Sequence, residues 1–232
     1  FFLTNLSTVK DSLRATIDFQ LGTKVFFDAL DVEENLLKKK FLAAYLNVRA
    51  GSSFSKNVID EIPYLINKLK GVSLDGPVNI EFYKDVCKVS LKLKKKPDDD
   101  VDALIGFQTN VQKKPEVIGG VKLSLNNLFK SSKKIDLNWQ KPTELNQQLN
   151  VSLDYPNVFL SNFGVVGRLD FLKRDTSFLN VAYKGGLYYQ LSKQIIGFNV
   201  TRKVSSLFNE NYQSDSLASF KSINTSLTYE LD

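Results

Sequence analysis

The segment SFLNVAYKGGLYYQLSK, residues 177–193, alternates apolar and polar side chains over most of its length. Leu179 and Val181 would point one way, whereas Asn180 and Lys184 would point the other. Because successive side chains of a β-strand project to opposite faces, the segment is predicted to form one long strand with an apolar and a polar face. Strands of soluble proteins are usually about 5–6 residues long, whereas a tilted strand that crosses a bilayer needs roughly 9–11 residues. The length of this segment therefore favours a membrane β-barrel.

The same alternation recurs on both sides of this segment, through the second part of the chain. Helical periodicity is almost absent there. Polar and charged side chains gather on one face of the predicted strands, which is tolerated in a water-filled lumen and costly in lipid. The expected strands cover residues 103–110, 120–128, 135–140, 144–155, 165–171, 177–193, 196–201 and 222–231.

Aromatic side chains lie within or near the ends of several of these strands, where membrane barrels place an interfacial girdle. Alternation alone is also compatible with a soluble β-sandwich or a lipocalin-like barrel, and this alternative stays open. In the membrane interpretation, the predicted interface residues are Trp139, Tyr155, Phe178, Tyr183 and Tyr189.

The first part of the chain mixes helix and strand patterns. Apolar residues follow helical spacing over residues 58–69, and Pro63 is expected to kink or divide that helix. Cys87 lies on the apolar side of the closing strand, so it is interpreted as a core residue rather than a reactive thiol. A strand, a helix, a helix and a two-strand hairpin, in that order, are typical of a small α+β domain. Their expected ranges are 24–29, 33–46, 58–69, 78–82 and 87–93.

The composition excludes several classes of enzyme. The chain has no histidine and one cysteine, which rules out a His-based triad, a histidine zinc site and an intrachain disulfide. No catalytic residues, cofactor-binding motif or metal ligands are found, so the chain is predicted not to be an enzyme. The net charge of +6 comes with lysine clusters at the ends of apolar runs, where charge usually marks a solvated edge. That placement argues against a nucleic-acid partner.

Short stretches spread along the chain carry a resemblance through their order. They are VFF at 25–27, NLL at 35–37, the strand at 87–93, DALIGF at 102–107, IDLNW at 135–139, LDYP at 153–156 and LKRDTSFL at 172–179. In this order they resemble a POTRA domain followed by the outer-membrane β-barrel of the BamA/TamA superfamily. The resemblance is strongest to members from Bacteroidetes, and it covers most of residues 24–232.

The resemblance implies a domain organisation. Barrels of the superfamily are larger, so the strands here are expected to form about half of one, and the chain is expected to be a fragment. The implied parts are the end of a preceding POTRA-like domain at 1–22, a POTRA-like domain at 23–96, a solvated linker at 97–101 and barrel strands at 102–232.

The resemblance also implies a function based on binding rather than catalysis. It predicts a factor that inserts β-barrel proteins into the outer membrane, with its N-terminal part in the periplasm. The implied partners are unfolded outer-membrane proteins, accessory periplasmic or outer-membrane subunits and the lipid bilayer; no cofactor is implied. A polypeptide secretion translocator and a passive channel or structural barrel remain as alternatives. The first barrel strand would lie at the lateral seam of the barrel, with Ala103, Leu104, Ile105, Gly106, Phe107 and Gln108 as its central residues.

Overall fold

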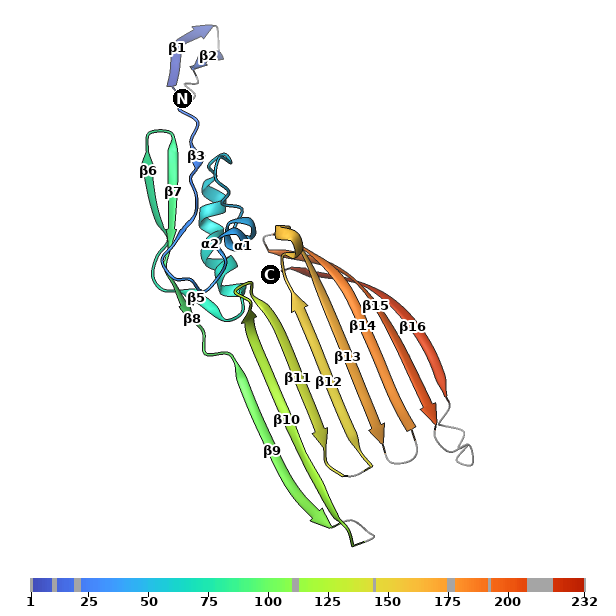
Figure 1. The fold of residues 1–232 in the computed structure, drawn as a ribbon. Helices are drawn as coiled ribbons and strands as arrows, with labels where there is room; N and C mark the ends of the chain where they lie inside the picture. Colours follow the sequence, from blue (N-terminus) through green and yellow to red (C-terminus); the bar gives the residue numbers. More distant parts are fainter. Residues whose placement is uncertain are drawn as a thin grey trace.

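The computed structural model of the protein describes residues 2–9, 12–18, 22–109, 113–143, 145–174, 178–191, 193–207 and 219–231. Three parts follow one another along the chain (Figure 1). A hairpin of β1 (Phe2–Val9) and β2 (Ser12–Asp18) comes first. An α+β unit follows, and a broad antiparallel sheet completes the described chain.

The α+β unit is built around one strand, β7 (Val86–Leu91). This strand pairs antiparallel with β6 and parallel with β3 and β4, while β5 and β8 form a separate antiparallel pair. The two helices lie together on one side of these strands (Figure 1). The remaining elements are β3 (Phe26–Phe27), β4 (Asp31–Val32), α1 (Lys39–Tyr45), α2 (Lys56–Lys68), β5 (Val72–Leu74), β6 (Asn79–Tyr83) and β8 (Leu93–Lys95).

The hydrophobic core belongs to the α+β unit alone. Among the described residues whose burial is known, every buried hydrophobic side chain lies between Phe27 and Leu93. Cys87 and Val89 of β7 are fully buried in it, which confirms the interpretation of Cys87 as a core residue. Burial raises the pKa of the Cys87 thiol, so the reactive thiolate is disfavoured there.

The predicted start of the first helix was wrong, and one of the two effects predicted for Pro63 does not occur. The first helix begins at Lys39 rather than at residue 33, because the backbone at Lys38 is extended and its N–H donates to the carbonyl of Lys130 at 2.9 Å. Pro63 does not divide α2, which runs through it. Ile62 and Ile66, on either side of Pro63, are fully buried, and this packing offsets the hydrogen bond that proline cannot make.

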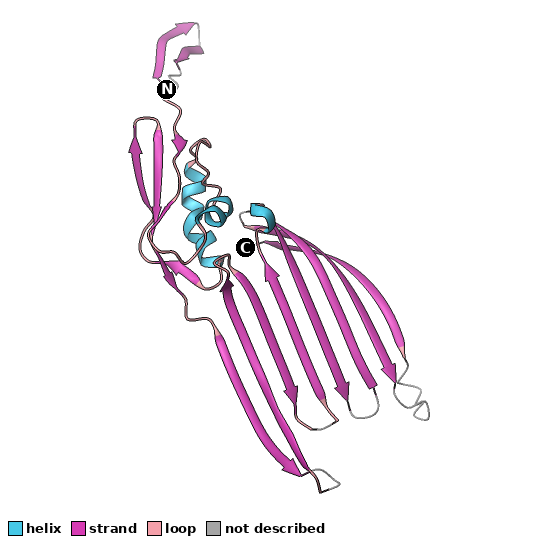
Figure 2. Cartoon of the chain, in the orientation of Figure 1, coloured by secondary structure: helices cyan, strands magenta, loops and turns pink. Residues whose placement is uncertain are grey.

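The broad sheet contains eight antiparallel strands in sequence order, each paired with the next (Figures 1 and 2). The eight strands predicted from alternation are therefore confirmed, and the sheet resembles part of a barrel. A short 3₁₀ helix, η1 (Val158–Leu160), lies in one turn. The strands are β9 (Asp100–Thr109), β10 (Pro115–Leu128), β11 (Lys133–Lys141), β12 (Gln147–Tyr155), β13 (Phe163–Arg174), β14 (Phe178–Leu191), β15 (Gln194–Leu207) and β16 (Phe220–Leu231).

The register gives the sheet two chemically different faces. Asp136, Ser152 and Arg168 are directly paired across β11, β12 and β13, and we call their side the polar face. Leu137 pairs with Val151 on the other side, which we call the apolar face. No described helix is long and apolar enough to cross a membrane.

Candidate functional site

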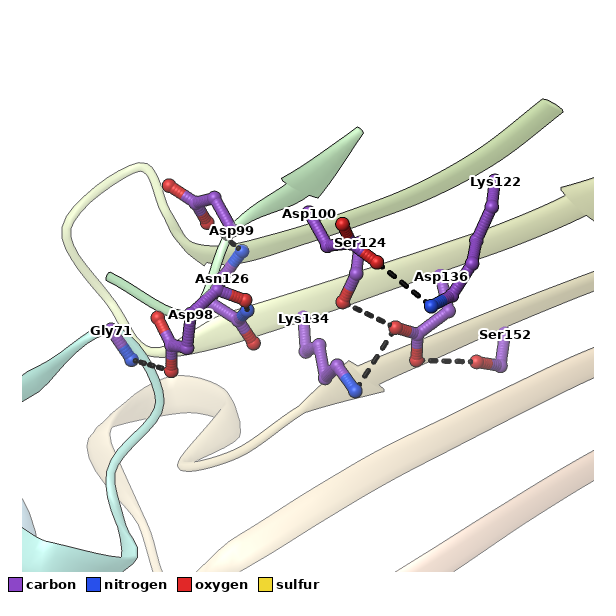
Figure 3. Close-up of polar contacts among 10 residues, drawn as sticks. All are labelled: Gly71, Asp98, Asp99, Asp100, Lys122, Ser124, Asn126, Lys134, Asp136 and Ser152. Carbon is purple, nitrogen blue, oxygen red and sulfur yellow. Dashed lines mark hydrogen bonds and ion pairs between the residues drawn. The ribbon is translucent and has the colours of Figure 1, made fainter. Parts of the chain in front are cut away.

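The polar face carries a hydrogen-bonded network centred on Asp136. Its carboxylate accepts from the hydroxyl groups of Ser124 at 2.7 Å and Ser152 at 3.1 Å, from the two neighbouring strands. The ammonium group of Lys134 lies 3.0 Å from the same carboxylate, and Lys122 forms a 2.8 Å ion pair with Asp100 (Figure 3). These side chains satisfy one another across strands, as polar groups on the wet side of a barrel wall do.

The network continues towards the middle of the sheet. The amide of Asn150 donates to Asp170 at 2.6 Å, and the guanidinium of Arg168 donates to the same carboxylate at 3.0 Å. Nearer the α+β unit, the hydroxyl of Tyr188 donates to Asp154 at 2.9 Å. The polar face thus presents both donors and acceptors to the space beside it.

The apolar face is uncovered. Leu227 is 80% exposed and Ile223 is 71% exposed, although both are large hydrophobic residues in the middle of β16. Soluble monomers rarely leave such a continuous apolar surface in water. Other exposed apolar side chains on this face include Val101, Ile105, Phe107, Leu153, Leu187, Ile196, Phe198, Val200, Tyr229 and Leu231.

Three of the five predicted interface aromatics lie at suitable positions. Trp139 and Tyr155 lie on the apolar face near opposite ends of the sheet, as their pairing with Leu149 and Val165 shows. Tyr189 also lies on this face, near the same end as Tyr155. These positions fit an interfacial girdle.

The other two predicted interface aromatics do not fit that role. Phe178 pairs with Arg174 and shares the polar face with Asn180, two residues further along β14. The sequence already indicates this placement, because Phe178 directly precedes Leu179 and successive residues of a strand point to opposite faces. Tyr183 lies on the apolar face but well inside β14, opposite Leu169, and away from either end of the strand.

The six predicted seam residues all lie on β9, at the edge of the sheet. Within the described chain, β9 pairs only with β10. Ala103, Ile105 and Phe107 project to the apolar face, and Leu104, Gly106 and Gln108 project to the polar face. The predicted strand extended to residue 110, which lies outside the described residues.

The segment 97–101, predicted as a solvated linker, is exposed at four of its five residues and also makes specific hydrogen bonds. The carboxylate of Asp98 accepts from the N–H of Gly71 at 3.0 Å, and that of Asp99 accepts from the N–H of Asn126 at 2.8 Å (Figure 3). The side-chain amide of Asn126 donates back to the Asp98 carbonyl at 2.6 Å. The backbone hydrogen bond from Asn126 lowers the pKa of Asp99 below its usual value. The segment therefore fixes the α+β unit to β10.

The turn between β10 and β11 makes a second attachment to the α+β unit. The side chain of Asn127 donates to the carbonyl of Leu36 at 2.8 Å, and the N–H of Lys70 donates to the hydroxyl of Ser132 at 2.7 Å. Gly71 has φ +77° and packs so closely on Asn127 that a Cβ would collide with it. Sequence reasoning missed this junction, because Asn and Ser in a turn indicate only a turn.

A cavity of about 530 Å³ lies between the end of α2 and the polar face. Its lining includes Tyr45 and Lys70 of the α+β unit together with Asp154, Tyr188 and Glu230 of the sheet. The hydroxyl of Tyr45 accepts from the Gln190 side chain at 3.2 Å, which ties α1 to β14. Within the described chain, no group of three or more acidic, cysteine or histidine side chains is arranged to hold a metal ion.

Comparison with known proteins gives a likeness of fold. No family model matches the chain, and no curated protein matches it. Among solved structures, CdiB from Acinetobacter baumannii aligns over 89% of this chain with a TM-score of 0.60 and 12% identity. BamA from Haemophilus ducreyi, in a form lacking POTRA domains 1–3, aligns over 98% of this chain with a TM-score of 0.56 and 10% identity.

The chain shares the fold of CdiB and BamA. It covers 42% of the CdiB chain and 48% of the BamA chain, so it spans less than half the length of either. At these identities the likeness concerns the path of the backbone and not the function.

Proposed function

We propose that the chain is part of an outer-membrane β-barrel protein of the BamA/TamA superfamily, which inserts other β-barrel proteins into that membrane. The observation that carries the proposal is the sheet that exposes its apolar face and carries hydrogen-bonded and ion-paired side chains on its polar face. Such a sheet is inverted relative to a soluble fold, and a barrel wall between lipid and water has this arrangement.

Strand length supports the membrane part of the proposal. β14 has 14 residues, and a strand of that length extends about 45 Å at roughly 3.3 Å per residue. With the tilt of about 45° common in membrane barrels, it spans about 33 Å, close to the roughly 30 Å of a hydrocarbon core. A soluble sandwich would bury one face of this sheet, yet none of its hydrophobic side chains with known burial is buried.

The α+β unit supports the assignment of a periplasmic POTRA domain. It precedes the first barrel strand directly, and the alignment with BamA over 98% of the chain necessarily includes it. β6 pairs only with β7 within the described chain, so its other edge is open to an added strand. An unfolded barrel protein could pair there through its backbone, by β-augmentation.

In this proposal β9 is the strand at which the barrel opens. β9 lies at the edge of the sheet. It packs so closely on β10, its one described neighbour, that a Cβ on Gly119 of β10 would collide with the carbonyl oxygen of Leu104. Weak pairing of β9 on its other edge would let a substrate strand enter between it and the last strand of the barrel.

A second function, secretion of a polypeptide through the lumen, is favoured by the polar face. Its hydrogen-bonded side chains extend across the strands from Asp100 through Asp136 to Asp170, and would line a water-filled path. A secretion translocator would affect one exported polypeptide, whereas an insertion factor affects many outer-membrane proteins.

The test is a disulfide that locks the seam in the full native protein. Cys87 is replaced by serine, and the Ile105→Cys substitution is paired with a cysteine on the last native strand. We expect insertion of outer-membrane proteins to stop in the locked form and to recover with reductant. Normal insertion in the locked form contradicts the proposal, and loss of a single secreted polypeptide with normal insertion favours the translocator.

The matched control is a lock inside the sheet. Asn180 and Ser205 are directly paired on β14 and β15, so Asn180→Cys with Ser205→Cys cross-links strands that never separate in this mechanism. We expect this variant to insert outer-membrane proteins normally in both redox states.

A further inference from the structure

Two turns at the end of the sheet nearest the α+β unit expose large apolar side chains. Phe129, in the turn between β10 and β11, is 74% exposed, and Phe159, in η1 between β12 and β13, is 95% exposed. Leu160, next to Phe159, is 45% exposed. These side chains belong neither to the core of the α+β unit nor to the strands.

The backbone holds these side chains outward in a disfavoured conformation. Phe129 has φ +57°, Phe159 has φ +54° and Leu160 has φ +57°, in the left-handed region that large residues rarely adopt. A turn exposed only to water would be served better by glycine or asparagine at such positions. Large apolar residues there are favourable when their side chains reach an apolar medium.

A lysine accompanies the aromatic groups on the apolar face. The ammonium of Lys133 lies 3.8 Å from the ring centroid of Tyr155 and 5.6 Å from that of Phe129. Aromatic rings attract the cation, and the aliphatic stem of a lysine packs on apolar surface while its head reaches polar surroundings. This combination is the one that residues adopt at the boundary between acyl chains and phospholipid headgroups.

We propose that Phe129 and Phe159 insert into the periplasmic leaflet of the outer membrane, with Lys133 at its anionic phospholipid headgroups. The inference rests on the proposed function, because it takes the apolar face to be in lipid. The two turns continue that face directly: Tyr155 and Phe163 lie on it on either side of the second turn. This continuity and the positive charge favour a phospholipid surface as the partner.

The insertion would fix the α+β unit relative to the membrane. The carbonyl of Lys130, next to Phe129, accepts from the N–H of Lys38, and Asn127 donates to the carbonyl of Leu36. The same turn thus binds the α+β unit through its backbone and Asn127 and meets lipid through Phe129. Depth of insertion of the turn would set the height of the α+β unit above the leaflet.

The test uses tryptophan quenching by brominated phospholipids in the full native protein. The 232 residues contain one tryptophan, Trp139 on the apolar face, and any tryptophan elsewhere in the native protein is replaced by phenylalanine. Phe129→Trp and Phe159→Trp are each made with Trp139→Phe and reconstituted in phosphatidylcholine–phosphatidylglycerol vesicles with bromine on the acyl chains. The matched control is Tyr83→Trp with Trp139→Phe, because Tyr83 is exposed and is the last residue of β6. The β6–β7 hairpin lies away from the broad sheet (Figure 1).

We expect both turn variants to be quenched at least about twofold more strongly than the Tyr83→Trp variant, and most strongly by bromine near the headgroups. Adding Lys133→Gln to the Phe129→Trp variant should remove any preference for vesicles that contain phosphatidylglycerol over vesicles of phosphatidylcholine alone. Quenching of the turn variants no greater than that of the control overturns the inference.

The wild-type protein separates this inference from the function on which it rests. Quenching of Trp139 without quenching of the turn variants overturns only the leaflet contact. Absence of quenching at Trp139 overturns the membrane-spanning sheet itself, and with it the proposed function.

Discussion

The α+β unit and the broad sheet use the same kinds of residue in opposite ways. In the unit, Cys87, Val89 and Leu91 point inward and are buried. In the sheet, Leu227 and its neighbours are exposed on the apolar face, and the polar network lies on the opposite face. The hydrophobic effect acts on both, so in the proposed function the two regions have different surroundings: water around the unit and an apolar medium around the sheet. Charged substitutions therefore distinguish the two regions.

A charge in the core of the α+β unit should have the largest effect. Val89→Asp places an unpaired carboxylate at a fully buried position, which costs more than about 4 kcal/mol and should unfold the unit. Cys87, the only cysteine, reports this directly, because its buried thiol with raised pKa should react with a maleimide only after unfolding.

Tyr83→Asp is the control for that experiment. Tyr83 lies on the same hairpin but is exposed, so the charge stays in water. We expect slow labelling of Cys87 in this variant, as in the wild type. Slow labelling in Val89→Asp would mean that the unit lacks the core described here.

A charge on the apolar face of the sheet should destabilise the protein less than a charge in the core of the α+β unit, and it should do so only when the sheet is in a membrane. Val151→Arg places a cation in the middle of β12 on this face. In a barrel surrounded by lipid, a cation at this position lowers the stability of the folded barrel by about 2–4 kcal/mol. Asn150→Arg, one residue away on the polar face, keeps a carboxylate partner in Asp170 and should be nearly neutral. Refolding yield into vesicles measures the difference. Equal yields for the two variants would contradict the assignment of the faces.

The two faces of the sheet were predictable from the sequence, because the alternation of side chains along a strand depends only on neighbouring residues. Alternation placed all eight strands, and Leu179 with Asn180 already fixed the phase of β14. Phe178 lies on the polar face and Tyr183 lies well inside β14, because residue type alone specifies neither the face of a strand nor the distance from its end. An aromatic residue indicates an interface only where it lies both on the apolar face and close to the end of its strand.

The junction between the two regions was not predictable, because its partners are far apart in sequence. Asp98 meets Gly71, and Asn127 meets Leu36, across folded elements. The same long-range contacts moved the start of α1, since the Lys38 N–H is taken by Lys130. Runs of Asp, Asn and Ser have the composition of any solvated loop, and only the three-dimensional arrangement gives them specific partners.

Loosening the junction should change how the two regions are held together without unfolding either. Gly71→Ala forces a side chain against Asn127 at φ +77° and should cost about 1–3 kcal/mol at the junction. Nitroxide labels are attached at Tyr83→Cys and Ser206→Cys, with Cys87 replaced by serine. The distribution of distances between the two labels, measured by electron paramagnetic resonance, should broaden. Gly51→Ala is the control, since Gly51 has φ +79° but nothing near its Cβ. A narrow distribution in Gly71→Ala would show that the junction does not orient the unit.

The smallest expected effect is the pH dependence of the same junction. The pKa of Asp99 is lowered chiefly by the hydrogen bond from the Asn126 N–H, so the carboxylate stabilises the junction above its ordinary value of 3.8. That contribution should be lost as the pH falls through the lowered value, when the carboxylate takes up a proton. Because Asp99 is exposed, the change should be roughly half a kcal/mol or less.

Hydrogen exchange of the Asn126 amide, corrected for its intrinsic pH dependence, should show reduced protection below about pH 3.8 in the wild type. Asp99→Asn keeps an acceptor for that amide but has no proton to gain, so its protection should not change over this range. The same pH dependence in both proteins would mean that another group controls the junction.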